Sequence, residues 1–159
     1  MIPRVPGDRR TTLAITVAVG VLLAGVVYFG FREPATAADP AWPRTPDPAL
    51  TPGATLPADT ATICKSGYSA SVRHVSRAQA RTVFAAYHVP YAQHARGELD
   101  HLIPLALAGS NDLTNLWPQL GSRPNHKDVQ ESSLHRQVCR GVITLAEAQR
   151  LIVDPVNWT

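Results

Sequence analysis

The chain of 159 residues has only two cysteines, Cys64 and Cys139, and no C-x-x-C pair. Structural zinc sites are usually built from such closely spaced pairs, so this scarcity argues against a structural zinc domain. Two cysteines in an exported chain most simply form one disulfide. This disulfide would close a loop of about 75 residues and, in the chain-entropy model, stabilise the fold by about 4 kcal/mol.

Charged residues are also few, at 17% of the chain, and the formal net charge is +3. Between residues 63 and 153, ten basic residues stand against six acidic ones. Such an excess is compatible with a polyanionic partner but does not by itself indicate nucleic acid. No internal repeat is visible, and the length suits one domain of modest size once the chain ends are discounted.

Charge is absent from residues 11–31, an apolar run that follows a basic segment at residues 1–10. The run is long enough to cross a bilayer, and the preceding arginines predict a cytoplasmic N-terminus with the remainder exported. Ala37 completes an A-x-A motif, so a retained signal anchor and a cleaved signal peptide both stay open. Both predict an extracytoplasmic domain, either anchored by a single span through residues 11–31 or secreted.

Proline recurs every few residues between positions 32 and 58. Such a stretch predicts an extended, semi-rigid linker that holds the following domain, residues 59–159, away from the membrane or cell wall.

The domain begins with weak alternation over residues 68–75, which predicts a short strand. Ser76 and Gln79 have the spacing of a capping box and predict the start of a helix that ends before Pro90. Residues 99–107 predict a further strand, interrupted by a proline.

Two more helices are predicted near the C-terminus. The first covers about residues 125–138, with Lys127 and Glu131, and then Glu131 and His135, as i,i+4 pairs. The second begins at Thr144, where Glu147 completes another capping box. Together these elements predict a small α+β domain with flanking helices.

Asp100 and His101 are adjacent, so on a regular strand their side chains point to opposite faces. This suits two different tasks, such as Asp100 binding a metal and His101 acting on a water. The ordinary alternative is that Asp100 caps a turn and His101 is a half-buried histidine, which is the better interpretation for an isolated pair. Asn115, and the helix that Asn125 opens, change that balance.

The stretch GELDHLIPLALAGSNDLTNLWPQ, residues 97–119, resembles the exported bacterial branch of the HNH endonuclease family. The resemblance continues downstream and covers about residues 63–153. The further residues that carry it are Lys127, Asp128, Glu131, Leu134, His135, Val138, Cys139, Gly141, Glu147, Ala148 and Gln149.

This resemblance implies a ββα-metal domain that hydrolyses phosphodiester bonds. His101 would be the general base that takes a proton from the attacking water. Asp100 would hold a divalent cation, most simply Mg²⁺, with Mn²⁺ also suited and Zn²⁺ less so. Asn115 would orient the His101 ring or tie the loop in place. No small-molecule cofactor is implied.

The resemblance places the second metal ligand on the helix, at Asn125 or His126. Counting back from the Lys-Asp pair favours Asn125, whereas His126 is the better ligand by chemistry. The two side chains lie about 100° apart on a helix, so only one readily faces the metal. If neither reaches it, the domain binds without cutting.

Four basic side chains are candidates for contact with nucleic acid, with DNA favoured over RNA. Lys127 could meet phosphate as a point charge, and Arg73, Arg77 and Arg81 would form a basic stripe if one helix carries them all. Solvated helix residues are the ordinary alternative. A competing function is a disulfide-stapled extracytoplasmic module that binds nucleic acid or other polyanions without catalysis.

Overall fold

The computed structural model describes residues 42–121 and 123–158. The basic N-terminal segment, the apolar run at residues 11–31 and the first part of the predicted linker lie outside these residues. Predictions about export and anchoring therefore stay predictions. Among the described residues, no helix has both the length and the apolar character that a membrane span requires.

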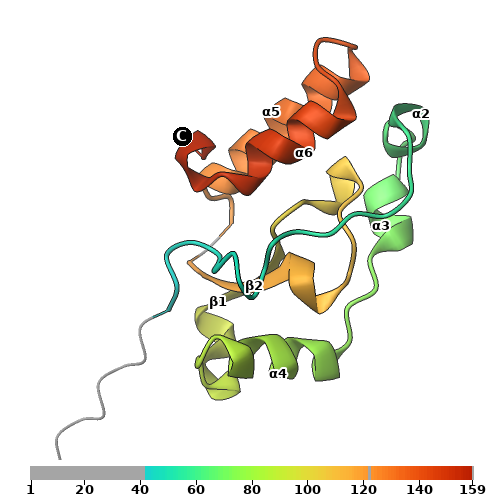
Figure 1. Cartoon of the computed structure of the whole chain (residues 1–159). Helices are drawn as coiled ribbons and strands as arrows, with labels where there is room; N and C mark the ends of the chain where they lie inside the picture. Colours follow the sequence, from blue (N-terminus) through green and yellow to red (C-terminus); the bar gives the residue numbers. More distant parts are fainter. Residues whose placement is uncertain (1–41, 122, 159) are drawn as a thin grey trace, which may run out of the picture. The chain divides into compact units, whose positions relative to one another are not determined.

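Helices surround a small antiparallel sheet of two strands, β1 (Gly97–His101) and β2 (Leu116–Leu120). Figure 1 shows α5 and α6 packed together on one side of this sheet and α4 on the other. This arrangement confirms the α+β prediction. The helices are α2 (Thr60–Ile63), α3 (Tyr68–Val72), α4 (Arg77–Ala86), α5 (His126–Cys139) and α6 (Leu145–Val153), with short 3₁₀ turns at Tyr91–Arg96, Leu105–Leu107, Leu113–Asn115 and Pro155–Asn157.

Two clusters of buried apolar side chains hold these elements together. The larger one joins α5 and α6 to the loop that follows β1, with Leu107, Leu134 and Ile152 at its centre. The smaller one lies under α4 and is formed by Trp42, Phe84 and Val89. The sheet lies between α5 and α4, so both of its strands are anchored to a packed helix.

Part of the predicted linker is folded onto the domain. The ring of Trp42 packs edge-on against Phe84, with the ring centroids 5.5 Å apart. Thr51 is buried and donates a hydrogen bond from Oγ1 to the Leu116 carbonyl at 2.9 Å, and Thr55 forms a β-bridge with Gly109. The residues between the prolines make these contacts with the domain. Residues 42–58 therefore belong to the folded unit.

The prediction of a strand at residues 68–75 is wrong, because residues 68–72 form helix α3. Alternation was weak there, and no strand of the described chain lies beside this segment to pair with it. The strand predicted over residues 99–107 is β1 and ends at His101. Pro104 comes three residues later, just before a 3₁₀ turn. Because proline has no backbone N–H, it cannot donate the hydrogen bond that a longer ladder would need.

Local capping signals were more reliable. The Ser76 side chain accepts from the Gln79 amide and the Gln79 side chain accepts from the Ser76 amide, which confirms the predicted capping box of α4. Thr144 caps α6 by accepting from the Glu147 amide, but no bond from the Thr144 amide to the Glu147 side chain completes the predicted capping box. Helix α5 begins at His126 with Asn125 as its N-cap.

Candidate active site

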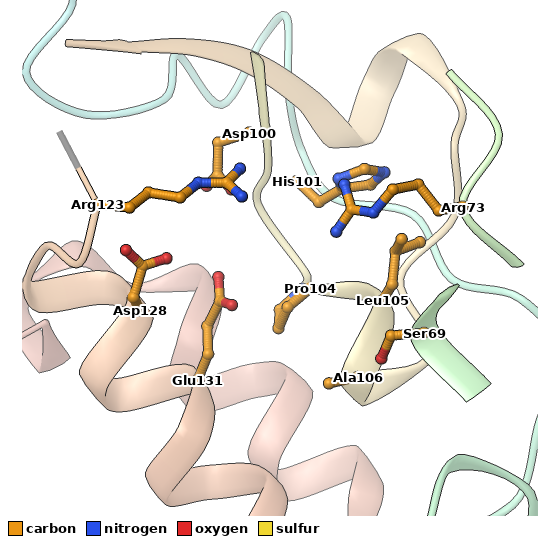
Figure 2. A pocket seen from close by; sticks show the side chains of 10 residues that line it. All are labelled: Ser69, Arg73, Asp100, His101, Pro104, Leu105, Ala106, Arg123, Asp128 and Glu131. Atoms are coloured by element: carbon orange, nitrogen blue, oxygen red, sulfur yellow. The ribbon is translucent and has the colours of Figure 1, made fainter. Parts of the chain in front are cut away.

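A cavity of about 140 Å³ opens where β1, α3 and α5 meet (Figure 2). Asp100 and His101 reach it from the end of β1, and acidic side chains reach it from the first turns of α5. Its lining consists of Ser69, Arg73, Asp100, His101, Pro104, Leu105, Ala106, Arg123, Asp128 and Glu131. The structure thus brings together residues that are up to 62 positions apart in the sequence.

Asp100 is largely buried, and one of its two carboxylate oxygens is already engaged. Oδ2 accepts from the indole Nε1 of Trp117 at 3.2 Å and pairs with Lys127 Nζ at 2.8 Å. Trp117 is the residue opposite Asp100 in the β1–β2 register, so the sheet itself fixes this contact. Oδ1 is therefore the oxygen that Asp100 can offer to a cation.

Lys127 lies beneath the cavity with only 1% of its surface exposed. Its ammonium donates to the His101 carbonyl at 2.7 Å and to Glu131 Oε1 at 2.5 Å, and it pairs with Asp100. These acceptors satisfy all three ammonium protons. Desolvation alone would lower the pKa of Lys127, but the Asp100 and Glu131 carboxylates outweigh it and raise the pKa. The expected phosphate contact from the helix surface is therefore not available to Lys127 in this fold.

Two carboxylates from α5, Asp128 and Glu131, point toward the side of the cavity where Asp100 lies (Figure 2). Burial raises the pKa of Glu131 to about 7, although the adjacent Lys127 ammonium acts in the opposite direction. Neither acid was among the predicted site residues, because acids in the first turns of a helix also suit its dipole. The pattern in the sequence that pointed to them was their position one and four residues after Lys127.

His101 is a buried histidine whose ring is held by Asn111. Its Nε2 lies 3.2 Å from Asn111 Oδ1, and the same oxygen accepts from the His74 amide at 3.2 Å. The Asn111 Nδ2 donates to the Val72 carbonyl at 2.8 Å, which fixes the amide orientation. Oδ1 is thus an acceptor, so the hydrogen lies on Nε2 and Nδ1 is the basic nitrogen of His101.

The environment keeps this imidazole neutral. Desolvation lowers the pKa of His101 below its usual 6.5, and the Arg73 and Lys127 charges act in the same direction, while the Asn111 bond and the Asp100 charge oppose them. Neutral imidazole is the form in which histidine accepts a proton. Asn111 was not among the predicted site residues, although it contacts the His101 ring.

Asn115 is completely buried and ties the loop between the two strands. Its Oδ1 accepts from the Ile103 amide, and its Nδ2 donates to the Ile103 and Ser110 carbonyls, all between 2.8 and 2.9 Å. Gly109 lies so close that an added Cβ would sit 1.7 Å from the Ile103 carbonyl oxygen. Of the two roles predicted for Asn115, these contacts correspond to holding the loop, because Asn111 and not Asn115 bonds to the His101 ring.

Neither of the two predicted helix ligands lines the cavity. The Asn125 side chain caps α5 by accepting from the Asp128 amide at 3.1 Å, and its Nδ2 lies 3.4 Å from Glu98 Oε1. His126 is exposed on the first turn. The α5 side chains that do reach the cavity are Asp128 and Glu131.

The predicted arginine stripe does not lie on one helix. Arg73 follows α3 in extended conformation and lines the cavity beside His101, whereas Arg77 is the first residue of α4. A shallow hollow next to the cavity is lined by both of them together with Tyr91. Arg81 lies over the Tyr91 ring, with its guanidinium carbon 5.3 Å from the ring centroid.

A further arginine, Arg123, lines the cavity on the side away from Arg73 (Figure 2). It pairs with Glu98, and this hydrogen bond is the main cause that raises the pKa of Arg123. Asp100 and Asp128 contribute in the same direction. The cavity is therefore lined by three carboxylates, those of Asp100, Asp128 and Glu131, and has an arginine guanidinium at each end.

The predicted disulfide joins Cys64 to Cys139. The predicted pairing of Lys127 with Glu131 is confirmed, whereas the predicted pairing of Glu131 with His135 is wrong. The His135 Nε2 lies 3.2 Å from the Ile63 carbonyl oxygen instead.

Comparison of the chain with known protein-family models, with characterised proteins and with solved structures gives no match, so the assignment of a function depends on the geometry of the site and on the sequence resemblance.

Proposed function

We propose that this protein is a metal-dependent endonuclease of the HNH type that hydrolyses nucleic acid, DNA in preference to RNA, outside the cytoplasm. The observation that carries the proposal is the pairing of a neutral, oriented His101 with Asp100 in one cavity that also contains acidic and guanidinium groups. The order β1, β2, α5 corresponds to the ββα arrangement that the sequence resemblance implies.

His101 would act as the general base. With the hydrogen on Nε2 donated to Asn111, the lone pair on Nδ1 takes a proton from a water that attacks the phosphorus atom. Burial favours the neutral ring before the reaction, and the adjacent Asp100 carboxylate stabilises the positive charge after it. The Lys127 bond to the His101 carbonyl fixes the backbone from which this ring projects.

The three carboxylates of the cavity would hold the divalent cation. Asp100 offers Oδ1, and Asp128 and Glu131 offer carboxylates from α5, which are oxygen donors of the kind that Mg²⁺ or Mn²⁺ prefers. Their ligand atoms do not all lie within 4.8 Å of one another in this structure, so rotation of the side chains would have to bring them together around the ion. Bound there, such an ion would stabilise the charge on the leaving oxygen. Asn125 would act through Asp128, whose amide it caps, and need not bind the ion itself.

The two guanidinium groups would bind the substrate backbone. Arg73 and Arg123 lie at opposite ends of the cavity, and guanidinium groups bind phosphate oxygens in bidentate geometry. The hollow with Arg73, Arg77 and Tyr91 continues from the cavity and offers a path for the neighbouring nucleotides. Contacts to the backbone alone predict little sequence preference.

The test is nicking of supercoiled plasmid by the full-length protein in detergent, with Mg²⁺, with Mn²⁺ and with a chelator. We expect cation-dependent nicking that His101→Ala abolishes while the circular dichroism spectrum stays unchanged. His88→Asn is the matched control, because this exposed histidine has a positive φ of 57° that asparagine tolerates.

A folded, disulfide-bonded wild-type protein that cuts neither DNA nor RNA with any of these metals would refute the proposal. Salt-dependent retention of DNA by such an inactive protein would then support the alternative of a binding module.

A further inference from the structure

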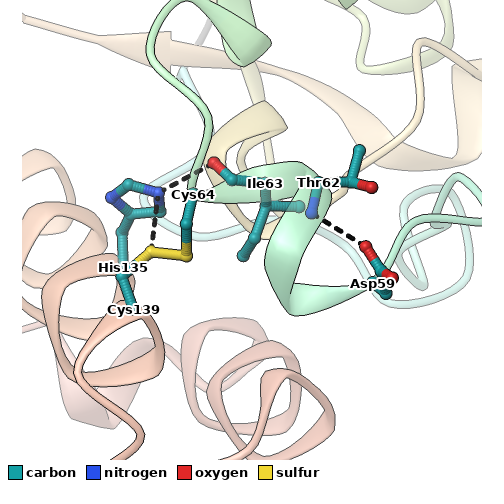
Figure 3. Close-up of a disulfide and its surroundings, with 6 residues drawn as sticks. All are labelled: Asp59, Thr62, Ile63, Cys64, His135 and Cys139. Atoms are coloured by element: carbon teal, nitrogen blue, oxygen red, sulfur yellow. Dashed lines mark hydrogen bonds between the residues drawn. A yellow bond between two sulfur atoms is a disulfide. The ribbon is translucent and has the colours of Figure 1, made fainter.

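A second group of potential metal ligands lies at the C-terminal end of α5, away from the cavity. The disulfide joins Cys64, which follows α2, to Cys139, the last residue of α5, and His135 stands one turn earlier on the same helix (Figure 3). One ligand atom from each of the three residues lies within 4.8 Å of the other two. In the described part of the chain, no other three His, Cys, Asp or Glu side chains meet so closely.

Apolar side chains beside the three ligands also hold α2 against α5. Ile63, Leu134 and Val138 are neighbours of the three ligands in sequence, and each is at least 98% buried in the same apolar cluster. They keep α2 against α5, and the two cysteine Cα atoms are 5.7 Å apart. Opening the disulfide therefore leaves two thiols and an imidazole close together.

We propose that the reduced protein binds one zinc-like cation through Cys64, His135 and Cys139, so that the metal replaces the disulfide as the cross-link between α2 and α5. A dithiol reductant supplies two electrons and two protons to the S–S bond and becomes a disulfide itself. The cation then displaces the two thiol protons. Two thiolates balance its double positive charge, and the imidazole binds as a neutral ligand.

The rearrangement this requires is small. Tetrahedral zinc, with bonds of about 2.3 Å to sulfur, holds two sulfur atoms roughly 3.8 Å apart. Rotation about the cysteine Cα–Cβ bonds supplies this separation. In the oxidised protein, the His135 Nε2 donates a hydrogen bond to the Ile63 carbonyl. In the metal-bound form the ring hydrogen would lie on Nδ1, so that Nε2 binds the ion. Both cysteines are exposed, so reductant, ion and a water as fourth ligand have access.

This site is independent of the proposed nuclease. In the oxidised protein neither sulfur is a thiolate, so the same three residues cannot hold the metal. The domain would then be cross-linked in both redox states, by the metal when reduced and by the disulfide when oxidised.

The test is titration of the full-length protein with Co²⁺, which reports thiolate ligands through a charge-transfer band in the near ultraviolet. The protein is reduced with a phosphine, freed of reductant without oxygen, and titrated in detergent. We expect one equivalent to bind, Zn²⁺ to displace it, and no band in the oxidised protein. His135→Ala should lower the affinity at least about tenfold, whereas His88→Asn should leave it unchanged.

Two results would overturn the proposal. One is a reduced wild-type protein that is folded by circular dichroism and shows no charge-transfer band. The other is an unchanged affinity in His135→Ala, which keeps both cysteines and so separates loss of a ligand from loss of the fold.

Discussion

The two ends of α5 contact the rest of the domain in different ways. Near the N-terminal end, Lys127 pairs with Asp100 and donates to the His101 carbonyl at the end of β1, and Glu131 pairs with Lys127 along the helix. At the C-terminal end, an exposed disulfide and a cluster of apolar side chains join α5 to α2. A network of buried charges fails when one partner is removed, whereas a cross-link beside an apolar core can be lost without disturbing a distant site.

The largest effect should come from breaking the charge network. Lys127→Met leaves the buried Asp100 and Glu131 carboxylates without their cation, and we expect the free energy of unfolding to fall by about 4 kcal/mol. Urea unfolding measures this change. Nicking should also be lost, because Asp100 and the His101 backbone lose their anchor.

Arg136→Ala is the matched control for this change. Arg136 is exposed on the same helix, and its removal should alter the stability by less than about 0.5 kcal/mol. A similarly small effect of Lys127→Met would show that the charges do not hold this end of α5.

The second effect concerns the disulfide. Replacing both Cys64 and Cys139 by alanine should lower the free energy of unfolding by about 4 kcal/mol, because the unfolded chain loses a cross-link that spans 75 positions. Nicking per folded molecule should stay at the wild-type rate, since the cavity lies at the other end of α5. A lower rate in fully folded protein would show that the two ends are coupled.

The same contrast explains what the sequence could predict. The helix caps at Ser76 and Thr144 and the disulfide were predictable, because each follows from local spacing or from the number of cysteines. The burial of Lys127 depends on Asp100, which is 27 positions away and reaches it only through the packing of β1 against α5. Local pattern carries no signal for such a contact.

Residues 42–58 show the same limit from another side. Their prolines correctly indicate a segment without regular structure, yet Trp42 and Thr51 find partners on α4 and β2. Asn111 is likewise of a residue type that is common in turns, and only the fold places it against the His101 ring. The pair Asp100–His101 was predictable as part of a site because the whole motif around it resembles a known family.

A third, smaller effect tests the orientation of the base. Asn111→Ala removes the acceptor for His101 Nε2, so the ring loses its fixed tautomer and we expect the nicking rate to fall about tenfold. Single-turnover rates at saturating protein separate this change from weaker DNA binding. An unchanged rate would mean that Asn111 holds only the loop through its bonds to Val72 and His74.

The smallest effect is on the pH profile, and it is specific to the cavity end of α5. In the proposed mechanism the neutral His101 ring is the active form, and its pKa is lowered, mainly by desolvation. The rate should therefore fall in two steps: protonation of Glu131, a proposed metal ligand with a pKa of about 7, causes the first. Protonation of the His101 ring causes the second fall, whose midpoint lies below pH 6.5. Asn111→Ala should move this fall to still lower pH, because the Asn111 bond raises the pKa of His101. Arg73→Gln should move it toward 6.5, because the Arg73 charge lowers that pKa.

The alanine pair at positions 64 and 139 should leave the midpoint unchanged, and the same shift in all three variants would assign the fall to unfolding and not to His101.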